Sequence, residues 1–336
     1  MNARPTLKDV AELAGVSFKT VSRVVNGESG VSPAMHAKVQ EAVDTLGYRR
    51  NHSAQALRKS GQRLGTIGVV HADIANPFAA AVHQSIERYA RDHDTLLLSG
   101  STAEDTDQQD RLVEAFVARR VDGLAVIPSG DEPGPALRQE LQRGTPIVFI
   151  DRDPGVRADL VLSDHRGGAR SATAHLLSHG HTRIGFLGSR EKTVSVQQRR
   201  RGFDEAMRSV DGAISTVRTD LTSVEVAEQA VRQLFADRGA APTALFAAQN
   251  LAATGAVRAL HQLELQHEVA LVAFDHIEIA DIVEPGITTV PQNADEVGRR
   301  AAELLFARIA GNLDDAKRVV VPVDLVARGS GELRPT

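Results

Sequence analysis

The sequence contains no cysteine in its 336 residues. Disulfide bonds and catalysis by a thiol nucleophile are therefore excluded. It also lacks any apolar run that approaches the roughly twenty residues needed by a membrane-spanning helix, so we expect no membrane span and no membrane partner. Because the chain enters a predicted helical module almost at its first residue, we expect no export signal and a cytoplasmic location.

Sequence patterns typical of bound cofactors are also missing. There is no Gly-x-x-x-x-Gly-Lys phosphate loop and no Gly-x-Gly-x-x-Gly after a predicted strand, and Gly167-Gly168 lacks the rest of either pattern. The twelve histidines show no metal-ligand spacing. His175 and His179 lie one helical turn apart, but no acidic residue is close to them in sequence. We therefore expect no cofactor and no metal site.

The run from residue 6 to residue 26 predicts two short helices joined by a glycine turn. Thr6 and Asp9 have the spacing of a reciprocal cap, Gly15 permits the turn, and Ser17 can cap the second helix. The apolar residues expected on the inner faces are Val10, Leu13, Ala14, Val21, Val24 and Val25. The outer or flanking surface then carries Phe18, Lys19, Ser22, Arg23 and Asn26. Such a helix face can lie in a DNA major groove, the alternative being an ordinary surface pair of helices.

A third helix follows, capped by Ser32, with Pro33 at its first position and Gly47 at its end. Its inner stripe is formed by Val39, Ala42, Val43 and Leu46. Residues 1–60 hold nine Lys and Arg against five Asp and Glu, a balance of +4. The whole chain carries −4, so the remainder carries −8. A basic head on an acidic body favours a DNA-binding module joined to a domain that does not contact phosphate.

The stretch from Thr6 to Lys59 resembles the DNA-binding head of the LacI family of bacterial transcription regulators. The matching pieces, at the family's spacing and without a gap, are Thr6–Ala11, Ala14–Ser17, Thr20–Asn26 and Leu46–Tyr48. The resemblance implies that three residues read bases in the major groove: Phe18, Lys19 and Arg23. It implies that five others hold the DNA backbone: Thr6, Ser17, Thr20, Ser22 and Asn26.

The segment 51–59 has a helix-favouring composition but is too short to persist alone as a helix in water. It resembles the family's hinge helix, which orders on the operator and inserts a leucine into a minor-groove step. Leu57 matches that leucine and Ala54 the small residue beside it, the alternative being that Leu57 packs on the body. Family members usually carry proline where this chain has Arg50, so Arg49 and Arg50 would instead add phosphate affinity.

The rest of the chain alternates short apolar runs with amphipathic helical stretches, which indicates a parallel sheet covered on both faces. The predicted strands are 65–70, 95–98, 123–127, 146–150, 159–162, 184–187, 244–246 and 270–274. The resemblance implies a periplasmic-binding-protein-like α/β domain of two lobes, each a doubly wound parallel sheet. We predict a helix-turn-helix DNA-binding domain at 1–50, a hinge at 51–61 and an effector-binding domain at 62–336. Lobe 1 would comprise about 62–162 and 292–322, and lobe 2 about 163–291 and 323–336.

Open α/β sheets bind ligands beyond the carboxyl ends of their strands, and two such edges would face each other here. Carboxylates, amides and arginines at these ends suit sugar hydroxyls, and Phe78 can stack on a sugar ring. Taken singly, such residues often only cap turns or form solvated ion pairs. As a set they match the family's ligand positions. The candidate effector-binding residues are Asn76, Phe78, Asp151, Arg152, Arg199, Leu221, Gln249, Asn250, Asp275 and Gln292.

Two of these positions depart from the family pattern. Gln249-Asn250 stands where the family commonly has Asn-Asp, which removes a charge, and Leu221 stands where many relatives carry an aromatic residue. We expect a small-molecule effector, with a monosaccharide or derivative first and a nucleobase or nucleoside second.

The function predicted from the sequence is a ligand-controlled, sequence-specific transcriptional regulator, by family default a repressor of carbohydrate-utilisation genes. A homodimer would present two heads to a pseudopalindromic operator in double-stranded DNA. The tail after Pro322 has no leucine heptads, which favours a dimer over a tetramer. A sugar-binding transport component would need an export signal and has no use for the head. A sugar-processing enzyme would need an acid–base pair, for which Asp151 and Asp275 are candidates by residue type only.

Overall fold

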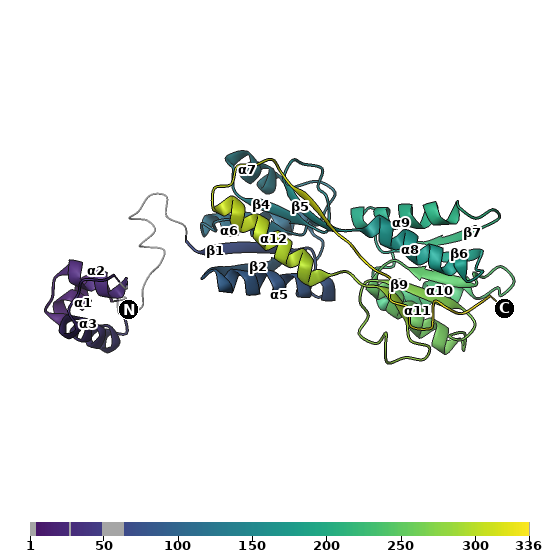
Figure 1. The fold of residues 1–336 in the computed structure, drawn as a ribbon, viewed down its shortest axis with the longest axis horizontal. Coiled ribbons are helices and arrows are strands. Elements are labelled where there is room, and N and C mark those ends of the chain that lie inside the picture. The colour runs from purple at the N-terminus through teal and green to yellow at the C-terminus, as the bar shows by residue number, and fades with distance from the viewer. Residues whose placement is uncertain (1–4, 27, 49–63, 336) are drawn as a thin grey trace. The chain divides into compact units, whose positions relative to one another are not determined.

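The computed structural model describes residues 5–26, 28–48 and 64–335, and the chain divides into two compact units, Met1–Leu64 and Gly65–Thr336 (Figure 1). We refer to the first unit as the head and to the second as the body. Among the described residues, no helix is long and apolar enough to cross a membrane.

The head is a three-helix module whose helix ends are set by capping residues. Thr6 and Asp9 form the predicted reciprocal cap, with the Thr6 backbone N–H donating to Asp9 Oδ2 at 2.6 Å. Gly15 ends the first helix with φ 63°, a left-handed conformation that glycine adopts at little cost. The Ser17 and Ser32 side chains accept from backbone N–H groups in the next two helices. The helices are α1 (Leu7–Ala14), α2 (Phe18–Val25) and α3 (Pro33–Leu46).

The head encloses a small apolar core in which Val10, Val21 and Val39 are fully buried. The prediction that Leu13 faces inward is wrong, because this side chain is 52% exposed. The stripe of α1 that packs on the core is Leu7, Val10, Ala11 and Ala14. These positions follow the i, i+3, i+4, i+7 pattern of one helix face, and Leu13 lies at the edge of that face.

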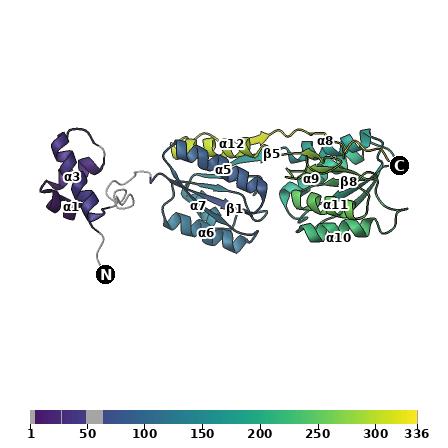
Figure 2. The ribbon, with the colours of Figure 1, turned by 90° about the horizontal axis from the view of Figure 1, so that it is seen from below.

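Lobe 1 of the body contains a six-stranded parallel sheet with the order β11-β5-β4-β3-β1-β2. The helices α5 and α12 pack together on one face of it and α6 and α7 on the other (Figure 2). The strands are β1 (Thr66–His71), β2 (Leu96–Ser101), β3 (Leu124–Val126), β4 (Ile147–Ile150), β5 (Asp159–Ser163) and β11 (Arg318–Val321). The helices are α5 (Pro77–Asp92), α6 (Thr106–Ala118), α7 (Pro135–Arg143) and α12 (Ala294–Ile309).

Lobe 2 contains a five-stranded parallel sheet with the order β10-β9-β8-β6-β7. The helices α8 and α9 pack together on one face and α10 and α11 on the other. The strands are β6 (Arg183–Leu187), β7 (Ile214–Arg218), β8 (Ala244–Ala247), β9 (Ala270–Phe274) and β10 (Thr288–Val290). The helices are α8 (His165–Ser178), α9 (Val194–Met207), α10 (Val224–Leu234) and α11 (Asn250–Gln262).

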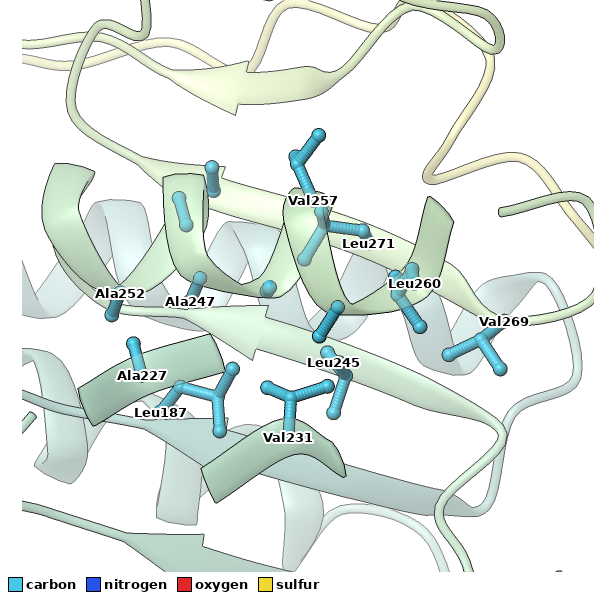
Figure 3. Close-up of a cluster of buried hydrophobic side chains, with 14 of the residues drawn as sticks. Leu187, Ala227, Val231, Leu245, Ala247, Ala252, Val257, Leu260, Val269 and Leu271 are labelled. Carbon is cyan, nitrogen blue, oxygen red and sulfur yellow. The ribbon is translucent and has the colours of Figure 1, made fainter. Parts of the chain in front are cut away.

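Successive residues of each central strand enter cores on opposite faces, as a doubly covered sheet requires. In lobe 2, Leu245 of β8 packs toward Val231 of α10 and Leu260 of α11 (Figure 3). Its neighbours Ala244 and Phe246 belong to the opposite core, beneath α8 and α9. This alternation confirms the predicted fold class of doubly wound parallel sheets.

The chain passes between the lobes three times. It leaves lobe 1 after β5 and enters lobe 2 at α8, and it returns after β10 through α12. After β11 the tail runs back along the second sheet, where Val326 bridges Thr289 and the Ser330 carbonyl accepts from Leu271 N–H at 3.0 Å. These three crossings of the chain join the two lobes, so residues from distant sequence positions come together between them.

Three edge strands were not predicted from the sequence: β7, β10 and β11. β7 and β11 carry mostly exposed or half-exposed residues, and each contains an arginine. An edge strand is solvated along one side, so it does not need the continuous apolar run that marks a central strand. β2 also extends three residues beyond the predicted end, through Ser99, Gly100 and Ser101, which have little strand propensity.

Candidate functional sites

The first candidate site is the outer surface of α2. Phe18, the first residue of this helix, is 39% exposed, and Lys19 next to it is also exposed. The side chain of Arg23 is 43% exposed, and its Nε lies 4.0 Å from Glu28 Oε2. An exposed phenylalanine beside two cationic side chains forms a surface suited to base edges and phosphates.

The flanking polar residues are partly engaged within the head. Ser17 accepts from Thr20 N–H at 3.2 Å, and their hydroxyl oxygens are 2.9 Å apart. Asn26 Nδ2 donates to Ser22 Oγ at 3.4 Å and to Glu28 Oε1 at 3.3 Å. Thr6 is held by Asp9 as described above. These residues therefore fix the ends of the helices that present the outer surface of α2.

Two predicted DNA-contact residues, Ala54 and Leu57, lie outside the described residues. The same is true of Arg50, where the family pattern usually has proline.

The second candidate site is a cavity of about 380 Å³ between the two lobes, here called the effector cavity. Nine of the ten predicted effector residues line it, from both lobes: Asn76, Phe78, Asp151, Arg152, Arg199, Gln249, Asn250, Asp275 and Gln292. The structure does not bring Leu221 into this cavity. Leu221 is 3% exposed and packs in the core beneath α10 and α11, and the next residue, Thr222, lines the cavity instead.

The centre of the effector cavity is a buried ion pair. Arg199 of α9 donates to both Asp275 carboxylate oxygens at 3.2 Å and to the Ala248 carbonyl at 2.7 Å. The guanidinium carbon also lies 3.9 Å from the centre of the Phe274 ring. Gln292 Nε2 donates to Asp275 Oδ1 at 2.6 Å. Such a bidentate, stacked arrangement fixes the orientation of the arginine and occupies its N–H donors.

The position of Arg199 depends on close packing between α8 and α9. Gly202 lies one turn further along α9, and a Cβ at this position would collide with the Arg166 carbonyl oxygen of α8. The small residue therefore allows the two helix backbones to approach. As a result, Arg199 reaches the carboxyl end of β9, where Asp275 follows the last residue of the strand.

A buried histidine, His165, links the ion pair to lobe 1. Arg199 Nε donates to His165 Nδ1 at 3.3 Å, and His165 Nε2 lies 3.2 Å from Asp151 Oδ1. Because arginine can only donate, Nδ1 must accept, so the proton of the neutral ring resides on Nε2, next to Asp151. Burial raises the pKa of Asp151, but the hydrogen bond from His165 and the positive charges of Arg152 and Arg199 lower it to about 2.

Arg152 forms a second fixed charge pair at the edge of the effector cavity. It donates to Glu104 Oε1 and Oε2 at 2.7 and 2.6 Å and to the Pro128 carbonyl at 2.9 Å. Burial lowers the pKa of this guanidinium, but the bond to Glu104 more than compensates and raises it. The two charges form a bidentate pair that is part of the cavity wall.

Asn76 and Asn250, one from each lobe, also line the cavity. Asn76 Oδ1 accepts from Phe78 N–H at 3.0 Å and so caps α5. Asn250 Nδ2 lies 3.5 Å from the same oxygen. The half-buried ring of Phe78 also lines the cavity. In the described part of the chain, the buried oxygens Gln249 Oε1 and Gln292 Oε1 have no hydrogen-bond partner.

Several cavity residues were missed by the sequence analysis. Glu104 follows β2, whose predicted end was too early, and Arg190 follows β6, an end that was not inspected. His165 was missed because it lies at a helix start and acts through its neighbours. The rule that ligands lie beyond the carboxyl ends of strands, applied to every strand, finds Glu104 and Arg190.

Comparison with known proteins identifies both units. Residues 6–51 match the model of "Bacterial regulatory proteins, lacI family", and residues 173–331 match that of "Periplasmic binding protein-like domain". A transcriptional regulator, PtxS, of Pseudomonas aeruginosa is 33% identical over 97% of this chain and 96% of its own. The ribose operon repressor of Escherichia coli is 32% identical over 97% of this chain and 99% of its own.

A solved structure shows the same architecture over nearly the whole chain. The lac repressor dimer bound to operator and the anti-inducer ONPF matches with a TM-score of 0.85 and 26% identity. The match covers 98% of this chain and 100% of that one. The protein therefore belongs to the LacI family of bacterial transcriptional regulators, with a helix-turn-helix DNA-binding domain and an effector-binding domain. This confirms the family and the regulatory function predicted from the sequence.

Proposed function

We propose that this protein is a homodimeric repressor whose affinity for a pseudopalindromic operator is controlled by a sugar bound in the effector cavity. The two heads of the dimer would each bind one half-site. The support for DNA binding is the exposed surface of α2 and the likeness to an operator-bound dimer. A regulator of this class acts where the chromosome is, so we place it in the cytoplasm.

In the head, Phe18, Lys19 and Arg23 read bases. Arg23 is suited to bidentate pairing with guanine once it leaves Glu28. The flanking polar residues Thr6, Ser17, Thr20, Ser22 and Asn26 position the head on the backbone. Leu57 and Ala54 act in the hinge, where an inserted leucine would kink the operator at its centre. The domain boundaries that we propose remain 1–50, 51–61 and 62–336, with the lobes as predicted.

The observation that carries the sugar proposal is the composition of the effector cavity. It combines the Arg199–Asp275 pair, amides from both lobes and the ring of Phe78. Carboxylate and amide oxygens accept from sugar hydroxyls, amide N–H groups donate to hydroxyl and ring oxygens, and the phenylalanine covers the apolar face of a sugar ring. Of the described lining residues, Phe78 alone is aromatic, so nothing there sandwiches a planar base.

We also propose that the protein is not an enzyme. The carboxylates that qualified by residue type, Asp151 and Asp275, are both engaged, the first with His165 and the second with Arg199 and Gln292. The pKa of Asp151 is lowered to about 2, so this group does not hold a proton at neutral pH and cannot act as a general acid. Its partners orient it as a ligand for hydroxyl groups.

A thermal-shift screen tests this proposal with full-length protein and a panel of monosaccharides, disaccharides, polyols and nucleosides. We expect at least one sugar to raise the melting temperature and to change the protein's affinity for its operator. Turnover of each bound sugar is assayed in parallel. Stabilisation by nucleosides alone, or conversion of a bound sugar, would contradict the proposal.

A further inference from the structure

A second cavity of about 410 Å³ adjoins the effector cavity and is here called the side cavity. Four residues line both cavities: Glu104, Arg152, Arg190 and Thr193. The Arg152–Glu104 pair is thus the common wall. Its guanidinium is held by the carboxylate and by the Pro128 carbonyl, and a ligand that occupies both spaces must lie along this pair.

Both lobes build the side cavity, as they build the effector cavity. Ser129, Gly130 and Asp131 come from the loop that follows β3 in lobe 1. Residues 190–193 precede α9, and Asp220 follows β7, both in lobe 2. A ligand that enters this space contacts the two lobes at a second place, so its extra part contributes to holding the lobes together.

The residues that line the side cavity determine which chemical groups can bind there. None of the described residues that line it has an aromatic or large aliphatic side chain, so they offer no surface to an apolar group. Its cations are Arg152, Arg190 and Lys192, against the carboxylates of Glu104, Asp131, Glu191 and Asp220. With no excess of positive charge, the space does not select a phosphate or carboxylate group. Its donors and acceptors, several of them exposed, suit neutral hydroxyl groups.

We infer that the effector is a disaccharide, with one ring in the effector cavity and the second in the side cavity, along the Arg152–Glu104 wall. This inference rests on the proposed function, since it takes the effector cavity as the site of the first ring. The second ring makes its contacts with the side chains that line only the side cavity, among which Asp131 and Lys192 lie on opposite lobes.

The test compares matched sugars by isothermal titration with the full-length protein. The panel pairs maltose, cellobiose and lactose with glucose and galactose, and it adds glucose 6-phosphate and gluconate as anionic sugars and phenyl glucoside as an apolar one. We expect one disaccharide to bind about tenfold tighter than either of its own monosaccharides, a difference equivalent to one or two net hydrogen bonds.

Variants of the side cavity make the test specific. Asp131→Ala and Lys192→Ala should each weaken disaccharide binding about fivefold and leave monosaccharide binding unchanged, since each removes about one hydrogen bond to the second ring. Asp211→Ala removes an exposed carboxylate outside both cavities and serves as the control.

The outcomes separate this inference from the proposed function. If monosaccharides bind as tightly as disaccharides, if an anionic or phenyl sugar binds most tightly, or if the two variants behave as Asp211→Ala, the disaccharide inference is overturned and the sugar-controlled repressor stands. If no sugar of the panel binds, the proposed function fails and the inference with it.

Discussion

At the scale of single residues, the effector cavity is organised by charges that satisfy one another. The chain Asp151–His165–Arg199–Asp275–Gln292 is continuous, with contacts between 2.6 and 3.3 Å. It begins at Asp151, directly after β4 of lobe 1, passes the crossover at the start of α8 and ends at Gln292 after β10. A sugar hydroxyl that bonds to one of these residues would therefore change the hydrogen bonds of residues on both lobes.

Asp275→Asn tests the role of this chain. Replacing the carboxylate by an amide leaves Arg199 as a buried cation without its anionic partner, so we expect the free energy of unfolding to fall by about 3 kcal/mol. Sugar binding should be lost, and operator binding should persist below the lowered melting temperature. Urea denaturation and titration with the active sugar measure the two effects. Asp281→Asn, at an exposed position, is the control, and sugar affinity equal to that of the wild type would contradict the assigned role.

Arg23→Ala tests the reading surface of α2. Loss of a bidentate contact should relax base preference at one position of each half-site by about 1–3 kcal/mol. Competition binding with operators substituted at single positions measures this preference. Glu28→Ala keeps the arginine and removes its neighbouring carboxylate, so it should retain the preference and bind all DNA more tightly. An unchanged preference profile for Arg23→Ala would remove this residue from the base-reading set.

Residue identity alone allowed much of the site to be predicted, but not all of it. Asp151, Arg199 and Asp275 were found because polar side chains at the ends of apolar strands are recognisable in the sequence. The side chain of Leu221 was misplaced, since the alternation that turns it into the core and Thr222 toward the cavity depends on the course of the loop after β7. His165 acts only through partners that the fold supplies.

At the scale of secondary-structure elements, the capping residues decide where the helices of the head begin. Ser32 accepts from Met35 N–H at 3.4 Å at the start of α3 and is not among the proposed DNA contacts. Ser32→Ala should therefore lower the stability of the head by about 1 kcal/mol without changing base preference. Hydrogen exchange of the first turn of α3 measures the effect. Ser29→Ala, in the exposed loop before the helix, is the control, and equal exchange in both variants would contradict the capping role.

A histidine of β1, His71, contacts a histidine of α5, His83, and the protonation of His71 affects the free energy of unfolding. His71 Nε2 lies 3.0 Å from His83 Nδ1, and burial, with a smaller contribution from His83, lowers the pKa of His71 from 6.5 to about 4. Because the unfolded chain binds this proton more readily, the contribution to stability is complete above pH 6.5 and is lost as the pH falls toward 4. Between pH 7 and pH 5 we expect a loss of about 2 kcal/mol.

Denaturation with urea at the two pH values, followed by circular dichroism, checks this prediction. His71→Gln removes the titrating group, so its stability should change less over the same interval. His36→Gln, on the exposed surface of α3, is the control for a histidine outside the pair. The same pH dependence in wild type and His71→Gln would show that another group is responsible.

Apolar sequence patterns predict the central strands of both sheets but not the edge strands β7, β10 and β11. Central strands such as β4 and β9 are buried along their whole length and were predicted from their apolar runs. The edge strands β7 and β11 were not, because one side of each meets solvent and their residues need not be apolar. The edge strand β10 was not predicted either, because it has only three residues, two of them threonines. On α1, the spacing that included Leu13 was compatible with a helix, but the buried face is set by the packing of α2 and α3.

At the scale of the whole molecule, the proposed mechanism couples two binding events, that of a sugar in the body and that of the operator at the head. The sequence indicated a basic head and an acidic, two-lobed body, and the fold and the comparisons support a regulator built from both. The volumes of the cavities could not be predicted from the sequence, since they depend on how two sheets from distant segments face each other. A sugar that changes operator affinity must have its own affinity changed by the same factor, typically equivalent to 1–3 kcal/mol.

The most direct test is selection of DNA from a random pool by the purified full-length protein, at fixed salt, with and without the sugar found in the screen. We expect one pseudopalindromic sequence to be enriched. The protein's affinity for this sequence should change, by a factor equivalent to about 1–3 kcal/mol, when the sugar is present. Retention of DNA without sequence preference in both conditions would contradict the proposed mechanism.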